Sequence, residues 1–267
     1  MSYPNTLPAA HKNLLDTIVE KLSQDPRIVG IGASGSFASN TMDQYSDIDL
    51  VIAIDPASYD NVMKQRFEIV KRIEGYFAGF TGEHVGEPRL IIALYSPALI
   101  HVDFKFVSLP DAAQRVDNTK VLWERGSLLS NIYKSAEYAY PQPDIQWIED
   151  RFWIWLHYGT GKIARGEYFE ALEFLSFLRM QVLSPLALKQ NGLTPFGVRT
   201  IEKRLPEFTS MLKTTVATPD KQPLIDAFQN ALKMYLALRS QEKVAVNSEA
   251  QAQCIAYFER ELLHSTA

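Results

Sequence analysis

Hydrophobic and polar residues follow two different patterns along the chain, and the pattern changes near residue 141. Before that point, short runs rich in β-branched residues alternate with turn residues, which is typical of strands. Apolar residues spaced three and four apart, among charged ones, indicate amphipathic helices. The first part is therefore predicted to hold helices over 14–22 and 59–80 and strands over 27–33, 46–55, 88–95, 99–109 and 119–125.

From Asp144 onward turn residues become sparse and helical spacing dominates. The predicted helices cover 147–164, 166–190, 198–205, 223–240 and 248–263, which is typical of a four- or five-helix bundle. Two prolines in the segment YPQPD, Tyr140 to Asp144, cannot continue a helix and indicate a linker. The predicted fold class is α+β, with a mixed β-sheet domain and flanking helices at 1–140, followed by an α-helical bundle domain at 144–267.

Composition excludes several classes of protein. With 46% hydrophobic and 22% charged residues, the 267-residue chain is predicted to fold as a globular protein. A net charge of −4 disfavours a nucleic-acid partner. The longest uncharged apolar stretch, from Leu90, breaks before His101, so we expect no membrane span. The start of the chain does not resemble a secretory signal, and the single Cys254 cannot form an internal disulfide, so we expect a cytoplasmic location.

Two glycine-containing motifs are weak matches to nucleotide-binding loops. The segment GIGASG carries Gly30, Gly32 and Gly35 in the dinucleotide-binding spacing. That fingerprint needs a helix before the second strand, but only ten residues lie between Ser36 and Asp47. The segment GTGK at 159–162 lacks the first glycine and the final Ser or Thr of a P-loop. Neither motif therefore predicts a nucleotide site by itself.

A stronger combination begins at Gly35 and Ser36 and continues at Asp47 and Asp49. Side chains alternate along a strand, so both carboxylates are predicted on one face, opposite Ile48. Adjacent like charges destabilise a half-buried strand unless a cation lies between them. Oxygen ligands of this kind suit Mg²⁺, and phosphate oxygens of the substrate complete the coordination shell of the ion. A Gly-Ser turn lets backbone N–H groups and a hydroxyl approach a phosphate.

A third carboxylate, Asp103, alternates with apolar residues in the segment LIHVDFKFV. If this strand neighbours the strand of Asp49, then Asp47, Asp49 and Asp103 could hold two metal ions for displacement at phosphorus. The alternative is that His101, Asp103 and Lys105 form the solvated face of an edge strand. In the helical half, Lys162 is a candidate for holding a triphosphate, against the alternative of an ordinary surface lysine.

The Gly35-Ser36 turn, the Asp47-x-Asp49 pair and the later Asp103 together resemble the nucleotidyltransferase superfamily, which has the polymerase-β-like fold. Ser34 departs from the apolar residue usual before the Gly-Ser pair. The sheet domain followed by a helical bundle is similar to the branch that modifies small molecules, including aminoglycoside and lincosamide antibiotics. The resemblance is specific over residues 27–107 and architectural over the helical half.

This resemblance implies a transferase that moves a nucleoside monophosphate from a nucleoside triphosphate, ATP being expected, to a hydroxyl of a small molecule, with release of pyrophosphate. It implies Asp47, Asp49 and Asp103 as catalytic and metal-binding residues for two Mg²⁺ ions, with Gly35 and Ser36 binding the nucleotide. Lys162 is added as a nucleotide-binding candidate from its own position in the helical half, not from the resemblance. A resistance role towards antibiotics is one expectation. The alternatives are a non-catalytic nucleotide-binding regulator and an RNA-tailing enzyme, while the acceptor and the oligomeric state stay open.

Overall fold

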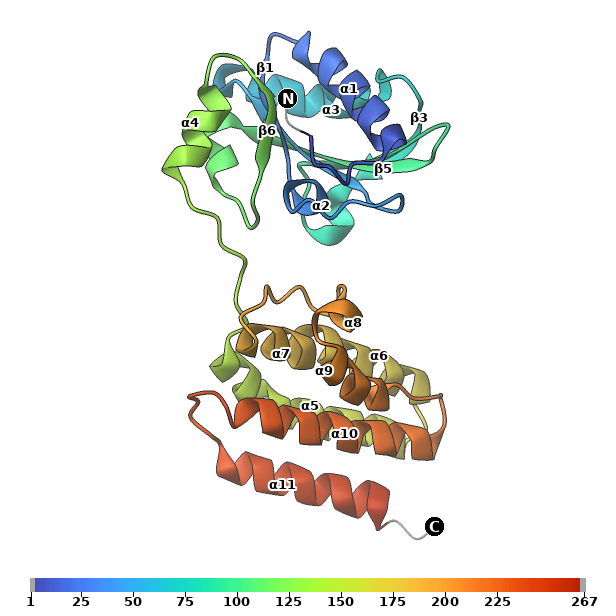
Figure 1. The fold of residues 1–267 in the computed structure, drawn as a ribbon. Coiled ribbons are helices and arrows are strands. Elements are labelled where there is room, and N and C mark those ends of the chain that lie inside the picture. Colours follow the sequence, from blue (N-terminus) through green and yellow to red (C-terminus); the bar gives the residue numbers. More distant parts are fainter. Residues whose placement is uncertain (1–2, 265–267) are drawn as a thin grey trace. The chain divides into compact units, whose positions relative to one another are not determined.

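The computed structural model describes residues 3–264. The chain divides into two compact units, Met1–Tyr140 and Pro141–Ala267. The boundary lies in the extended segment that contains the two prolines (Figure 1). Each unit has its own hydrophobic core. The predicted α+β fold class is confirmed: a mixed sheet precedes a helical unit.

The first unit is built on a six-stranded sheet with the order β3-β4-β5-β2-β1-β6. Strands β2 and β5 run parallel, while the other neighbouring strands run antiparallel. Because β5 lies between β4 and β2, it is an interior strand. The strands are β1 (Ile28–Ala33), β2 (Ile48–Ile54), β3 (Tyr76–Thr81), β4 (Leu90–Tyr95), β5 (Ile100–Ser108) and β6 (Lys120–Glu124).

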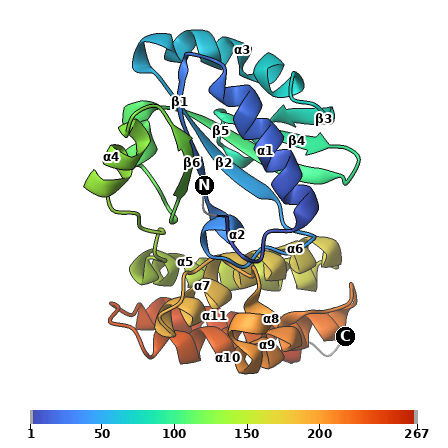
Figure 2. The ribbon, with the colours of Figure 1, turned by 45° about the horizontal axis from the view of Figure 1, so that its top comes forward.

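Helices cover both faces of this sheet (Figure 2). Helices α1 (Ala9–Ser23) and α3 (Tyr59–Lys71) pack on the face that buries alternate strand residues such as Leu50 and Phe104. Helix α4 (Leu128–Ser135) packs on part of the opposite face. The short helix α2 (Gly35–Ala38) follows β1 directly. The face opposite α1 and α3 is the one towards which Asp49 and Asp103 alternate.

The second unit is helical and surrounds a core that includes Trp153, Phe228 and Tyr235. One helical stretch, Tyr168–Gln190, is long and apolar enough to cross a membrane by length and composition alone. In this unit 56% of its most apolar window is buried, as in the core helix of a soluble protein. The helices are α5 (Ile145–Ala164), α6 (Tyr168–Leu178), α7 (Ser184–Gln190), α8 (Ile201–Arg204), α9 (Pro206–Leu212), α10 (Lys221–Arg239) and α11 (Ser248–Phe258).

The prediction of one helix over 59–80 is wrong in its last third. Helix α3 ends at Lys71, and the aromatic residues that follow form the edge strand β3. Gly75 has a φ of +87°, and its carbonyl accepts a hydrogen bond from the N–H of Ser96 (2.7 Å). This turn ends the helical path and aligns β3 with β4, so pairing between strands overrides the helical periodicity. Helices α4 and α9 lie outside the predicted elements.

Candidate active site

The carboxylates of Asp49 and Asp103 come from the parallel strands β2 and β5. Asp49 is the direct register partner of Asp103. Both are half-buried, whereas their neighbours Leu50 and Phe104 are buried in the core on the opposite face. Because paired residues on adjacent strands point to the same face, the two carboxylates are side by side. The interior position of β5 excludes the interpretation of Asp103 as part of an edge strand.

Gly35 lies against the carboxylate of Asp49. The N–H of Ser34 donates to the Asp49 carbonyl (3.0 Å), which ties the end of β1 to the start of β2. Gly35 has a φ of +58°, a conformation that favours glycine. A Cβ at this position would overlap Oδ2 of Asp49. The conformation and the close approach both require glycine, so the Gly-Ser turn and the acid pair form one local site.

Ser36 presents a hydroxyl without a protein partner. Its Oγ is buried and has no hydrogen-bond partner among residues 3–264. A buried hydroxyl that lacks a partner costs free energy unless a ligand or a water completes it. Since Ser36 directly follows Gly35, this donor lies in the turn that contacts the acid pair, where a phosphate oxygen could accept its hydrogen bond.

His101 is a neighbour of the acid pair that the sequence prediction did not assign to the site. Its Nε2 lies 2.8 Å from Oδ1 of Asp103, and donates a hydrogen bond to this carboxylate. The imidazole is 44% exposed and the Asp103 side chain 23% exposed. The alternation His101-x-Asp103 within one strand was the available signal, because residues two apart share a face. His101 therefore orients the Asp103 carboxylate.

Asp47 does not lie inside the strand as predicted, because β2 begins at Ile48. Within residues 3–264, no group of three or more His, Cys, Asp or Glu side chains could hold a metal ion. Asp47, Asp49 and Asp103 thus do not form a three-ligand site in this structure. A pair of carboxylates still fits Mg²⁺, which binds through one or two carboxylates with waters and substrate phosphates. The prediction of two ions stays a prediction.

Lys162 belongs to the second unit, in the last turn of α5. Its Nζ lies 2.6 Å from Oε2 of Glu167 and 2.9 Å from Oε2 of Glu170. Hydrogen bonds to these two glutamates raise the pKa of Lys162 above its usual range. Its positive charge is thus paired within its own unit. The predicted role of Lys162 in triphosphate binding stays a prediction.

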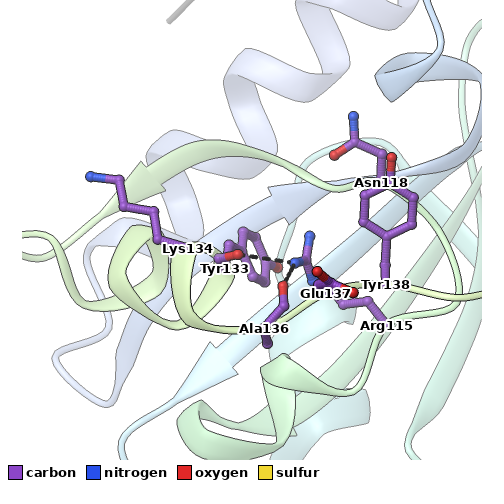
Figure 3. A pocket seen from close by; sticks show the side chains of 7 residues that line it. All are labelled: Arg115, Asn118, Tyr133, Lys134, Ala136, Glu137 and Tyr138. Atoms are coloured by element: carbon purple, nitrogen blue, oxygen red, sulfur yellow. Dashed lines mark hydrogen bonds between the residues drawn. The ribbon is translucent and has the colours of Figure 1, made fainter.

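A cavity of about 480 Å³ lies in the first unit beside α4 (Figure 3). Arg115 lines it, donating from Nη2 to the carbonyls of Tyr133 (3.1 Å) and Ala136 (2.7 Å). Its guanidinium also lies over the rings of Tyr133 and Tyr138, at 4.3 and 5.5 Å from their centroids. Burial raises the pKa of Tyr133 to about 12. A cation that binds the last carbonyls of a helix stabilises its C-terminus, so Arg115 anchors α4.

The fold and the acid pair define a class of protein. A mixed sheet that brings a Gly-Ser turn against one of two paired aspartates is suited to hold a metal-bound phosphate. Residues 15–91 match the family model of the nucleotidyltransferase domain, in agreement with the predicted superfamily and the predicted class of enzyme.

Three solved structures are similar to the chain in outline. An aminoglycoside 6-adenyltransferase from Bacillus subtilis is 15% identical, covers 94% of this chain and 95% of its own, and has a TM-score of 0.34. A nucleotidyltransferase-like protein from Exiguobacterium sibiricum is 14% identical. The match covers 94% of this chain and 80% of that protein, with a TM-score of 0.39. A c-di-GMP synthase from Capnocytophaga granulosa is 16% identical. The match covers 86% of this chain and 81% of that protein, with a TM-score of 0.33.

No curated protein matches the chain in sequence.

Proposed function

We propose that the protein transfers a nucleoside monophosphate from a nucleoside triphosphate, ATP being expected, to a hydroxyl of a small molecule and releases pyrophosphate. The observation that carries the proposal is the direct pairing of Asp49 and Asp103, with Gly35 packed against Asp49. A strand pair that opposes two half-buried acids is destabilised unless the site serves a cation. The Gly-Ser turn beside it supplies the donors that a phosphate requires.

The residues of the site have two roles, metal binding and triphosphate binding. Asp49 and Asp103 would hold Mg²⁺, and Asp47 is the further acid predicted for the site. When bound, the ion neutralises the charge that develops on the phosphate oxygens. The Ser36 hydroxyl and the turn around Gly35 would bind and orient the triphosphate. Positioning and charge neutralisation are the main sources of rate enhancement in phosphoryl transfer.

Asp103 would act as the proton acceptor. The acceptor hydroxyl gives its proton to the Asp103 carboxylate as its oxygen forms a bond to the α-phosphorus. The bond between the α-phosphorus and the bridging oxygen breaks, and pyrophosphate leaves. His101 donates a hydrogen bond to Oδ1 of Asp103 and so fixes the orientation of this carboxylate.

The replacement Asp49→Asn tests this function. It preserves the shape of the side chain and removes one of the two opposed charges. We expect pyrophosphate release from Mg-ATP, measured over a panel of hydroxyl acceptors, to fall by about 100-fold or more. The melting temperature without metal should be equal or higher, because the repulsion is relieved.

The exposed Asp60 of α3 provides the matched control, and Asp60→Asn should keep full turnover. Full turnover in Asp49→Asn would exclude the acid pair as the metal site. Nucleotide binding that ignores Mg²⁺, with no release of pyrophosphate from any acceptor, would identify a non-catalytic nucleotide-binding protein instead.

A further inference from the structure

The acid pair belongs to a row of directly paired residues that continues from β5 across β4 to the edge strand β3. Asp103 pairs with Ile92 on β4, and Ile92 pairs with Phe80 on β3. Asp49 pairs with Asp103 on the other side. Directly paired residues point to one face, so Phe80, Ile92, Asp103 and Asp49 follow one another on the face of the site.

The side chains that share this face on β3 and β4 are apolar. Along β4 the alternate residues Ile91, Ala93 and Tyr95 are buried, so the residues between them point to the other face. A solvent-facing side of an antiparallel strand is normally polar. Here it carries a surface that we call the apolar strip, made of Ala78, Phe80, Leu90, Ile92 and Leu94.

The apolar strip is open to ligand. Phe80 is 54% exposed and Leu94 is 36% exposed. The ring of Phe80 lies beside the ring of His84, at 5.4 Å between centroids. Exposed apolar residues that adjoin one another mark binding surfaces more often than exposed residues that occur singly. This surface is continuous with the acid pair through the pairing of Ile92 with Asp103.

Three charged residues next to the apolar strip, Glu87, Arg89 and Lys105, pair with one another. Lys105 Nζ lies 3.0 Å from Oε2 of Glu87, and Arg89 Nε lies 2.7 Å from Oε1 of the same residue. The hydrogen bond from Arg89, with another from Lys105, lowers the pKa of Glu87 to about 2. The apolar strip itself contributes no carboxylate, whereas a polycation would need several.

The strip also lies on the correct side for an acceptor. The Gly35-Ser36 turn contacts Asp49, so the triphosphate is placed at β1 and β2. An acceptor hydroxyl must reach Asp103 from the opposite side, which is β4 and β3. This step rests on the proposed function, because the assignment of Asp103 as proton acceptor does.

We propose that the apolar strip binds the acceptor, and that the acceptor is an uncharged hydroxyl compound with an apolar or planar ring next to the reacting hydroxyl. Phe80 and Leu94 contact the ring, while the hydroxyl points along the row towards Asp103. Selectivity for such a compound over a polycationic sugar follows from the absence of carboxylates on the strip.

Binding measurements on the full-length protein test this proposal without requiring turnover. The probes are phenyl β-D-glucoside, methyl β-D-glucoside and the polycation kanamycin, titrated by calorimetry in the presence of Mg²⁺ and a non-hydrolysable ATP analogue. The two glucosides share the same sugar and its hydroxyls, and differ only in the phenyl or methyl group on the anomeric oxygen. We expect the phenyl compound to bind about 10-fold more tightly than the methyl compound, and kanamycin to show no advantage over either.

Phe80→Ala and Phe77→Ala form a matched pair of variants. Phe77 lies on the same strand and is 52% exposed, but it falls at a register shift and pairs with no residue of β4. Phe80→Ala should weaken phenyl glucoside binding by about 3- to 10-fold and leave methyl glucoside unchanged. Phe77→Ala should change neither.

Three results would overturn the proposal: equal binding of the two glucosides, including no measurable binding of both; tighter binding of kanamycin; or equal effects of the two variants. Sedimentation of the wild type and Phe80→Ala adds one more test. An oligomer that Phe80→Ala dissociates would assign the strip to contact with a second copy of the chain. Failure of the proposed function would be distinguishable from these results, because the wild-type protein would then release no pyrophosphate with any acceptor.

Discussion

Two sites in this protein hold carboxylates in opposite ways. In the second unit, Glu149 is 0% exposed and accepts hydrogen bonds from Trp153 Nε1 (3.0 Å), Arg239 Nη1 (3.0 Å) and the Tyr235 hydroxyl. In the first unit, half-buried Asp49 is paired in register with another acid, Asp103. Glu149 is enclosed by three donors of the chain, while Asp49 faces a second carboxylate across the strand pair.

The difference distinguishes a structural acid from a functional one. A buried charge survives in a core only when partners replace the lost water, and Arg239 with two neutral donors does this for Glu149. Burial and the hydrogen bond to Glu149 raise the pKa of Tyr235, so its hydroxyl stays a donor. An acid opposed by a like charge lowers stability in the free protein. Its placement becomes favourable when a cation binds.

The largest expected effect in this comparison is that of Asp103→Asn on the chemical step. Loss of the proton acceptor should lower the single-turnover rate by about 10² to 10⁴. Nucleotide binding should weaken far less than the rate falls, because Asp49 and the Gly-Ser turn remain. Rapid-quench kinetics beside a nucleotide titration would measure both. Exposed Asp43 offers a control, and an Asp103→Asn rate equal to that of Asp43→Asn would make Asp103 a structural residue.

Glu149→Gln should act in the reverse manner, on stability and not on chemistry. The replacement removes the carboxylate charge that pairs with Arg239, and breaking a buried ion pair costs about 3 to 5 kcal/mol. Urea unfolding followed by tryptophan fluorescence reports it, because three of the four tryptophans lie in the second unit. The exposed Glu173→Gln should cost about 0.5 kcal/mol or less. Equal midpoints for the two variants would contradict a structural role of Glu149.

Gly35→Ala sharpens the comparison by disturbing Asp49 without changing its charge. Gly126 has the same φ of +58°, but a Cβ there would have no neighbour within 4 Å. Gly126→Ala should therefore cost only the left-handed conformation, about 1 to 2 kcal/mol. Gly35→Ala adds the overlap with the Asp49 carboxylate, so it should cost about 1 kcal/mol more and also impair turnover. Equal unfolding free energies with full turnover in both would show that Gly35 does not support Asp49.

The pattern of residues along the sequence was sufficient to predict most strands of the sheet, because their formation depends largely on residues that are neighbours in the chain. The runs that became β1, β2, β4, β5 and β6 were found because short β-branched runs bounded by turn residues are a local property of the sequence. The same reasoning failed at β3, since its residues also fit a helical spacing. Only pairing with β4 determined that 76–81 is a strand.

The candidate site shows the same division. The residue types and spacing of Gly35, Ser36 and Asp49 were sufficient to predict a phosphate and metal site. The sequence left the neighbour of β5 open, and the parallel register decided that Asp103 faces Asp49.

The donors around Glu149 and the apolar strip also came only from the tertiary structure. The physical reason is the same in each case. Periodicity along the chain determines which side of an element faces the core, because that depends on local geometry. The pairing of distant segments depends on nonlocal packing and hydrogen bonding, and these contacts exist only once the sheet and the helical core have formed.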